Sequence, residues 1–140
     1  MAVLKIASHI RKKISLFNRI TDINHPEEYD IDKVLDIIKT NSYYHVAEKV
    51  DAVRKAKDDK AKNEAKMKLP AVTWNGTFKT KNRSDLIHYS SFTALDFDHI
   101  QPEKMNGFGK WLQGFPCVYA YYITPSGKGC LLYTSPSPRD

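Results

Sequence analysis

The chain has 140 residues, of which 41% are apolar and 11% aromatic, so it is long enough to bury one hydrophobic core and short enough to form a single domain. Lysine and arginine number 22 against 16 acidic residues, and the net charge of +6 favours a polyanionic partner such as nucleic acid or a nucleotide, although a basic protein without such a partner has the same balance. No apolar run approaches the roughly 20 residues that a membrane span needs, and the two cysteines have neither metal-ligand nor disulfide-framework spacing. We therefore expect a cytoplasmic protein that does not enter a membrane.

The first half of the chain predicts one strand and two helices. Residues 14–18 alternate weakly and indicate a strand, and a loop around Pro26 then leads into a helix from about Asp30 to Thr40. A second, longer helix is predicted from Tyr43 to about Lys66, and it must end before Pro70. The positions expected to be buried are Val34, Leu35, Ile37 and Ile38 in the first helix, and Val46, Val50 and Val53 in the second.

The second half of the long helix is rich in lysine, aspartate and alanine, which is typical of a solvated face. Its cations could instead contact nucleic acid, and these are Arg54, Lys55, Lys57, Lys60 and Lys62. The sequence leaves both readings open.

The second half of the chain predicts more strands than helices. Residues 69–74 indicate a short strand, and Asn75-Gly76 predicts a tight turn that makes either a hairpin or a sharp corner with Thr77-Phe78. A helix is expected from Pro102 to Gln113. Residues 117–124 predict a central strand covered on both sides, with Val118, Ala120 and Tyr122 on one face and Tyr119, Tyr121 and Ile123 on the other.

A polar loop between these strands carries Lys79, Lys81 and Arg83. Three cations close to the entrance of the following strand could contact the phosphates of a nucleic acid. An ordinary exposed loop accounts for them equally well.

Residues 93–98, Thr-Ala-Leu-Asp-Phe-Asp, predict a strand whose alternation places Asp96 and Asp98 on one face and turns Leu95 and Phe97 toward the core. Two neighbouring carboxylates repel each other unless a cation or strong hydrogen-bond donors compensate them, which makes a divalent metal ion their natural partner. Two solvated acids on an edge strand are the alternative interpretation.

The loop Thr124-Pro125-Ser126-Gly127-Lys128-Gly129 follows the predicted central strand. Two glycines around a lysine allow backbone amides to approach an anion closely and add a positive charge, so Ser126, Gly127, Lys128 and Gly129 are candidate nucleotide-phosphate contacts. The spacing of a Walker A loop is absent, and an ordinary turn has the same sequence.

The segments 69–78, 95–99 and 122–129, in this order, resemble the VirE N-terminal domain family of mobile-element and replication proteins of Bacteroidetes. The pairing of an Asp-x-Asp strand with a later Ser-Gly-Lys-Gly turn is also similar to the catalytic core of the archaeo-eukaryotic primase (primase-polymerase) superfamily. The resemblance covers roughly residues 14–129.

This resemblance implies a nucleotidyltransferase in which Asp96 and Asp98 hold Mg²⁺ or Mn²⁺ and act as the catalytic acids, while residues 126–129 contact a nucleoside triphosphate. It also implies DNA as a partner, contacted by Lys79, Lys81 and Arg83, and a helicase or primase domain further along the parent protein. The primase pattern has a histidine just past the glycine turn and a third acid beyond it, and neither is present here. His99 does not occupy that histidine's position in the motif.

Residues 130–140, Cys-Leu-Leu-Tyr-Thr-Ser-Pro-Ser-Pro-Arg-Asp, resemble a translated sequencing adapter. On that interpretation residues 1–129 are an incomplete primase-polymerase-like domain, residues 130–140 are not native, and the tail becomes coil by Ser135. The fragment itself is then expected to be inactive even if its parent is an enzyme.

The patterns together predict an α+β fold, in which the strands near Val72, Leu95 and Val118 form one mainly antiparallel sheet and the two early helices pack outside it. Two functions remain open. One is a truncated metal-dependent nucleotidyltransferase, and the other is a catalytically inactive nucleic-acid-binding or regulatory module attached to a helicase or primase. A structural domain whose aspartates only cap a turn is a third alternative.

Overall fold

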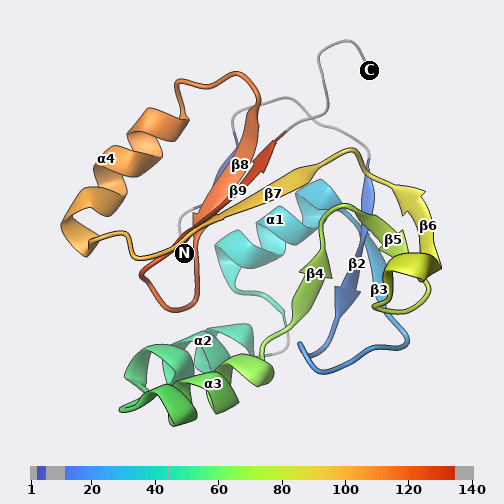
Figure 1. Cartoon of the computed structure of the whole chain (residues 1–140), viewed down its shortest axis with the longest axis horizontal. Helices are drawn as coiled ribbons and strands as arrows, with labels where there is room; N and C mark the ends of the chain where they lie inside the picture. Colours follow the sequence, from blue (N-terminus) through green and yellow to red (C-terminus); the bar gives the residue numbers. More distant parts are fainter. Residues whose placement is uncertain (1–2, 6–11, 44, 135–140) are drawn as a thin grey trace.

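The fold is α+β, with four α-helices and three small antiparallel sheets in the part of the chain that the computed structural model describes, residues 3–5, 12–43 and 45–134. In chain order the elements are β1 (Val3–Lys5), β2 (Lys13–Phe17), β3 (Glu27–Asp30), α1 (Ile31–Thr40), α2 (Val46–Lys55), α3 (Asp59–Met67), β4 (Ala71–Thr73), β5 (Gly76–Phe78), a 3₁₀ turn (Arg83–Asp85), β6 (Leu86–Tyr89), β7 (Thr93–Phe97), α4 (Pro102–Leu112), β8 (Val118–Ile123) and β9 (Cys130–Thr134). Figure 1 shows their arrangement.

The strands do not form the single sheet that was predicted. The largest sheet has the order β1-β8-β9-β7, while β4 pairs with β2 in a separate sheet of order β3-β2-β4, and β5 pairs only with β6. The separation arises at Asn75-Gly76, which makes a sharp corner between two sheets rather than a hairpin within one. An added Cβ on Gly76 would lie 2.1 Å from the carbonyl oxygen of His88, so only glycine fits where β5 meets β6.

Helices α1 and α4 cover opposite faces of the largest sheet (Figure 1). Val34 and Leu35 of α1 are buried in a cluster that contains Tyr119 of β8, whereas Leu112 of α4 is buried against Val118 and Cys130. Strand β8 is therefore an internal strand covered on both sides, as predicted.

The predicted alternation along β8 is wrong at its first two residues. Val118 packs on the α4 side together with Tyr121, while Tyr119 joins Ala120 and Tyr122 on the α1 side. The cause is an irregularity in the pairing with β9 between Val118 and Ala120, because an extra residue in a ladder reverses the facing of the side chains that precede it.

The single helix predicted for residues 43–66 is two helices, α2 and α3, with a break at residues 56–58. The apolar stripe of Val46, Val50 and Val53 is buried as predicted, but it ends at Val53, so burial no longer favours a continuous helix beyond that point. The Asp58 side chain then accepts a hydrogen bond from the amide of Ala61 at 2.7 Å and caps a new helix. Helix α3 packs against α2 (Figure 1) and has no buried residue, in agreement with the predicted solvated half.

Strand β2 connects the small sheet to the rest of the core. Ile14 belongs to the cluster around α1 and β8, and Leu16 to the cluster around α2, so one strand joins both. Ser15 lies between them and is fully buried, and its hydroxyl accepts a hydrogen bond from the amide of Phe78 at 2.9 Å. This hydrogen bond connects β5 to β2.

Candidate functional site

Asp96 is in β7, and Asp98 follows directly after the strand. Both carboxylates line the same pocket, whereas the ring of Phe97 points to the other side of the sheet and packs on Phe108 of α4, with ring centroids 5.1 Å apart. The two acids thus share a side, as the alternation predicts. Their role as metal ligands stays a prediction.

The prediction that Leu95 faces the core is wrong, because its side chain is 43% exposed. Leu95 is on the same side of β7 as Phe97, but β7 is an edge strand, and the aromatic contact with α4 is at Phe97. Alternation gives the side of a residue correctly, and the extent of the covering helix decides whether that residue is buried.

Partial burial and the charge of Asp98 together raise the pKa of the Asp96 carboxyl above its ordinary value. Partial burial is the largest cause, and the neighbouring charge of Asp98 adds to it, whereas the ammonium of Lys66 acts in the opposite direction. Asp96 in turn contributes, after burial, to raising the pKa of the Cys130 thiol to about 11. Two carboxylates and one ammonium give this site a formal charge of −1, which favours binding of a cation.

The turn at residues 124–129 lies against the end of β7. The carbonyl oxygen of Gly129 accepts a hydrogen bond from the Thr124 amide at 2.9 Å, and the Ile100 amide donates to the carbonyl of Lys128 at 2.9 Å. An added Cβ on Gly129 would lie 2.8 Å from the Phe97 carbonyl oxygen and 3.2 Å from a carboxylate oxygen of Asp98. Gly129 thus permits the turn and the acidic pair to approach each other.

The inner hydrogen bonds of this turn involve the predicted phosphate contacts. Gly127 has a positive φ of 75°, and its amide donates to the carbonyl of Thr124 at 2.9 Å. The Ser126 hydroxyl is 3.1 Å from the Thr124 hydroxyl and accepts from the Lys128 amide at 3.4 Å. Of the four candidates, Ser126 lines the pocket with the aspartates, and Lys128 is exposed.

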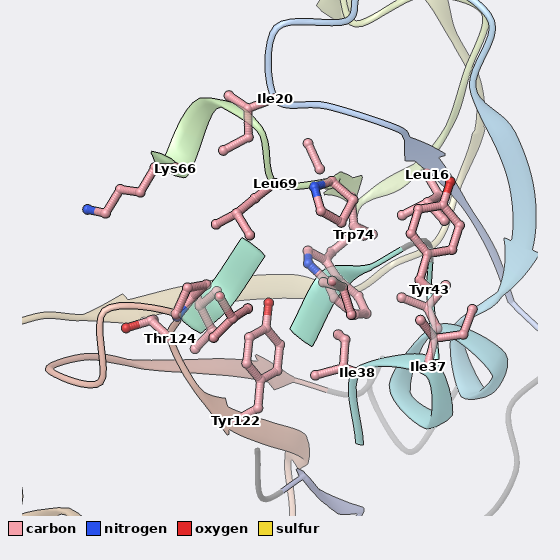
Figure 2. Close-up of a pocket in the computed structure, with 18 of the residues that line it drawn as sticks. Leu16, Ile20, Ile37, Ile38, Tyr43, Lys66, Leu69, Trp74, Tyr122 and Thr124 are labelled. Atoms are coloured by element: carbon pink, nitrogen blue, oxygen red, sulfur yellow. The ribbon is translucent and has the colours of Figure 1, made fainter. Parts of the chain in front are cut away.

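The pocket has a volume of about 510 Å³ and is lined mainly by apolar side chains. It lies between the two largest core clusters, so its lining comes from α1, α2, β4, β8 and β9 as well as from the acidic pair. In Figure 2, Lys66 and Thr124 are at one end of the pocket, Tyr43 and Ile37 are at the other, and Trp74 and Tyr122 lie between them. Sequence patterns gave no sign of this pocket, because its lining residues belong to helices and strands that are far apart in the chain.

Lys66 is a site residue that the sequence analysis missed. It lies in the last turn of α3, lines the pocket, and acts electrostatically on Asp96. Its sequence neighbourhood resembles any other part of the charged helix, so only the break at residues 56–58, which turns α3 back along α2, could have indicated its position.

The three cations proposed to contact nucleic acid do not line this pocket and differ among themselves. Lys79 and Arg83 are exposed on the loop between β5 and β6. Lys81 instead donates a hydrogen bond to the carbonyl oxygen of Ile20, and its ammonium lies 4.8 Å from the centroid of the Phe17 ring. Burial lowers the pKa of Lys81, an effect that the nearby Asp22 opposes. Lys81 therefore has an evident role within the fold.

Two cations of the predicted long helix, Arg54 and Lys55, make contacts within the protein. Arg54 donates to the carbonyl of Pro125 at 3.2 Å and so connects α2 to the 124–129 turn. Lys55 pairs with Asp51 at 2.5 Å on the exposed side of α2. Nothing in these contacts favours nucleic acid over a solvated face.

A metal ion at this site would have few protein ligands. Among the described residues no group of three or more histidine, cysteine, aspartate or glutamate side chains could hold a metal ion. Two carboxylates fit Mg²⁺ or Mn²⁺, which accept one or two carboxylates and complete their coordination with water and substrate phosphates.

Of the helices in the described part of the chain, none is long and apolar enough to cross a membrane.

A model of the BT4734-like N-terminal domain family matches residues 64–137, just over half of the chain. The matched span contains Lys66, both aspartates and the 124–129 turn, and it also includes most of the segment that resembles an adapter. Neither a curated protein nor a solved structure matches the chain.

Proposed function

The chain belongs to the BT4734-like N-terminal domain family, and on that basis we propose that it is part of a metal-dependent nucleotidyltransferase domain of the primase-polymerase type. The proposal includes a relationship to VirE N-terminal domains and to the catalytic core of the primase-polymerase superfamily. One observation carries it. Asp96 and Asp98 line one pocket together with Ser126, and the Gly129 backbone lies against the Asp98 carboxylate.

In the proposed site Asp96 and Asp98 hold Mg²⁺ or Mn²⁺, which supplies the positive charge that neutralises a triphosphate. Lys66, which lines the pocket and acts electrostatically on Asp96, adds a second positive charge. Ser126 and Lys128 lie on the turn next to the metal ligands and contact the phosphates. DNA and a nucleoside triphosphate are the proposed partners, with Lys79 and Arg83 the more accessible cations for a DNA backbone.

The first test is metal binding by the 140-residue chain, followed by the paramagnetic signal of free Mn²⁺. We expect one saturable Mn²⁺ site in the wild type and a loss of affinity of at least about tenfold in Asp96→Asn and in Asp98→Asn, because each removes one of two carboxylate ligands. Asp36→Asn is the matched control, since Asp36 is an exposed aspartate of α1 outside the pocket. Equal Mn²⁺ affinity in all four proteins would contradict the proposal.

The second test concerns the end of the sequence. We propose that residues 130–140 replace natural residues, although 130–134 form β9 between β7 and β8, and the family match extends to residue 137. Sequencing the gene again from genomic DNA across codon 129 checks this directly. A natural histidine soon after Gly129 and a later acid favour the enzyme, and the unchanged eleven residues would refute the replacement.

An inactive nucleic-acid-binding or regulatory module is the second candidate. The observation in its favour is that the described residues offer two carboxylates and no third metal ligand. The fragment is expected not to synthesise primers in either case. A parent protein with the natural continuation distinguishes the two, because only the enzyme incorporates nucleotides and loses this activity in Asp96→Ala.

A further inference from the structure

Four aromatic rings form a continuous row that leads from the sheet along α4 to the surface. Phe97 of β7 packs on Phe108 with ring centroids 5.1 Å apart, Phe108 packs on Trp111 at 5.5 Å, and Trp111 packs on Phe115 at 4.8 Å. The first two rings are partly buried against a core cluster, whereas Trp111 is 56% exposed and Phe115 39% exposed. Tryptophan is highly buried on average, so two solvent-facing rings at the end of this row call for a partner.

The helix surface beside the indole of Trp111 is open. Phe108, three residues earlier, lies next to the indole with an interplanar angle of 30°. Gly107, four residues before Trp111, is on the same side of the helix, and an added Cβ there would meet nothing within 4 Å. A flat group therefore has room to lie against the indole.

The exposed aromatic area is too small for a stable protein interface. A large aromatic side chain has a surface of roughly 150–250 Å², so the exposed parts of Trp111 and Phe115 together amount to roughly 200 Å². A stable protein–protein interface buries roughly 800 Å² on each partner. Two exposed rings match one or two flat bases instead, since every nucleic-acid base has a face that stacks on an aromatic ring.

The charges along α4 favour an anionic partner. Lys104 is two helical turns before Trp111 and lies on the same side of the helix, and Lys110 directly precedes Trp111. Both lysines are exposed, and Glu103 is the one acid within α4, so two ammonium groups outnumber one carboxylate. Aromatic rings combined with cations are the means by which proteins bind single strands without sequence preference.

We infer that the exposed face of α4 is a stacking platform for single-stranded nucleic acid, whose bases lie on Trp111 and Phe115. Lys104 and Lys110 lie beside the phosphates of the bound strand. This surface uses neither the metal site nor the turn at residues 124–129. The inference therefore goes beyond the proposed function and holds for the enzyme and for the binding module alike.

The platform is separate from the sites already described. Phe97 packs on α4, whereas Asp96 and Asp98 line the pocket on the other side of β7. Figure 1 shows α4 far from the loop between β5 and β6, whose cations are proposed to contact a DNA backbone. Contacts of a strand with α4 can therefore be tested without altering the pocket or that loop.

The test is fluorescence anisotropy with labelled oligo(dT), oligo(rU), an abasic strand of the same length and a DNA duplex. Trp111→Leu keeps an apolar side chain but removes the aromatic face, so we expect it to weaken oligo(dT) binding about tenfold. Binding of the duplex and of the abasic strand should not change, because neither offers an unpaired base. Trp111→Phe retains a ring and should retain most of the affinity. Oligo(rU) shows whether the platform accepts RNA as well as DNA.

A second variant leaves the rings unchanged. Gly107→Glu places a carboxylate beside the indole at a position with free space, and repulsion of the phosphates should weaken oligo(dT) binding about fivefold. Gly107→Ala is the matched control, since it adds one methyl group and should bind like the wild type. Trp111→Leu should lower the affinity by the same factor at low and at physiological salt, because stacking releases no counterions. Circular dichroism melts verify that each variant is folded.

The outcomes separate this inference from the proposed function. Equal oligo(dT) affinity of the wild type and Trp111→Leu would overturn the inference, while Mn²⁺ binding by the acidic pair would still uphold the metal site. An equal loss for single strand, abasic strand and duplex would also overturn it, since Trp111 would then not act by stacking. Self-association that Trp111→Leu abolishes, with oligo(dT) binding unchanged, would assign the face to a second copy of the chain and overturn the inference. A protein that binds no Mn²⁺ but loses oligo(dT) affinity in Trp111→Leu would support the platform and contradict the nucleotidyltransferase.

Discussion

The raised pKa of Asp96 makes the free energy of unfolding depend on pH. The pKa of Asp96 is raised in the folded state, so the folded chain binds that proton more tightly than the unfolded chain. Ionised Asp96 therefore lowers the free energy of unfolding at pH values above its folded pKa, and this loss disappears as the pH falls through it.

We predict that Asp96→Asn increases the free energy of unfolding at pH 7 by up to about 1 kcal/mol, a small effect because solvent screens this largely exposed carboxylate. The difference should vanish below pH 3.8, the ordinary value for aspartate, where the carboxyl is protonated in both states. Urea denaturation at the two pH values measures it. With saturating Mn²⁺ the order should reverse, since only the wild type is stabilised by a metal ion it binds well. A destabilised Asp96→Asn at pH 7 without metal would contradict the electrostatic account.

Lys81 and Lys79 are close in sequence, but their side chains have different surroundings. Lys81→Ala removes a hydrogen bond to the Ile20 carbonyl and the contact with the Phe17 ring, and we expect a loss of about 1 kcal/mol in the free energy of unfolding. Lys79→Ala, at an exposed position, should change it by less than about 0.5 kcal/mol. Thermal denaturation of both variants tests this, and equal stabilities would contradict the assigned role of Lys81.

Two glycines in different elements make opposite predictions. Gly107 is inside α4, where an added Cβ meets nothing within 4 Å, so Gly107→Ala should stabilise the protein by about 0.5–1 kcal/mol through helix propensity. Gly129 begins the return of the chain into β9, where a Cβ would lie 2.8 Å from the Phe97 carbonyl, so Gly129→Ala should cost about 1–3 kcal/mol. Melting temperatures of the pair measure both, and a tolerated Gly129→Ala would show that the turn does not lie tightly against β7.

The sequence predicted most helices and strands well because apolar periodicity and proline positions depend only on neighbouring residues. The stripe from Val46 to Val53 and the limit set by Pro70 need only neighbouring residues, and both predictions are confirmed. Two features depend on distant partners and were missed: the irregularity at Val118 and the assignment of β4 to a second sheet. The break at residues 56–58 was also missed, although its causes, the end of the apolar stripe at Val53 and the Asp58 cap, are local. The site follows the same rule, since Asp-x-Asp predicted two acids on one side, while the approach of Lys66 requires the fold of α3 against α2.

At the scale of the whole molecule, the net charge of +6 gives a prediction for nucleic-acid binding. Cations that neutralise phosphates release condensed counterions, so affinity for a single-stranded oligonucleotide should fall steeply with salt. If Lys79, Arg83 and Lys128 each contact one phosphate, the logarithm of the association constant should fall by about 2 for each tenfold rise in salt. Fluorescence anisotropy at low and physiological salt measures the slope, and a salt-independent affinity would exclude phosphate contacts. The triple alanine variant should lose most of the slope.

The position of β9 in the largest sheet has a consequence for the order of folding during synthesis. The sheet β3-β2-β4 is complete once residue 73 has left the ribosome, so this part, with α1 to α3, can form early. Strands β7 and β8 are not neighbours, and within the described residues it is β9, residues 130–134, that joins them. Until that strand emerges, β7 has no partner among the strands that the structure describes, and its exposed edge is available to other nascent chains. The last strand to be synthesised is therefore the one that completes the largest sheet of the described residues.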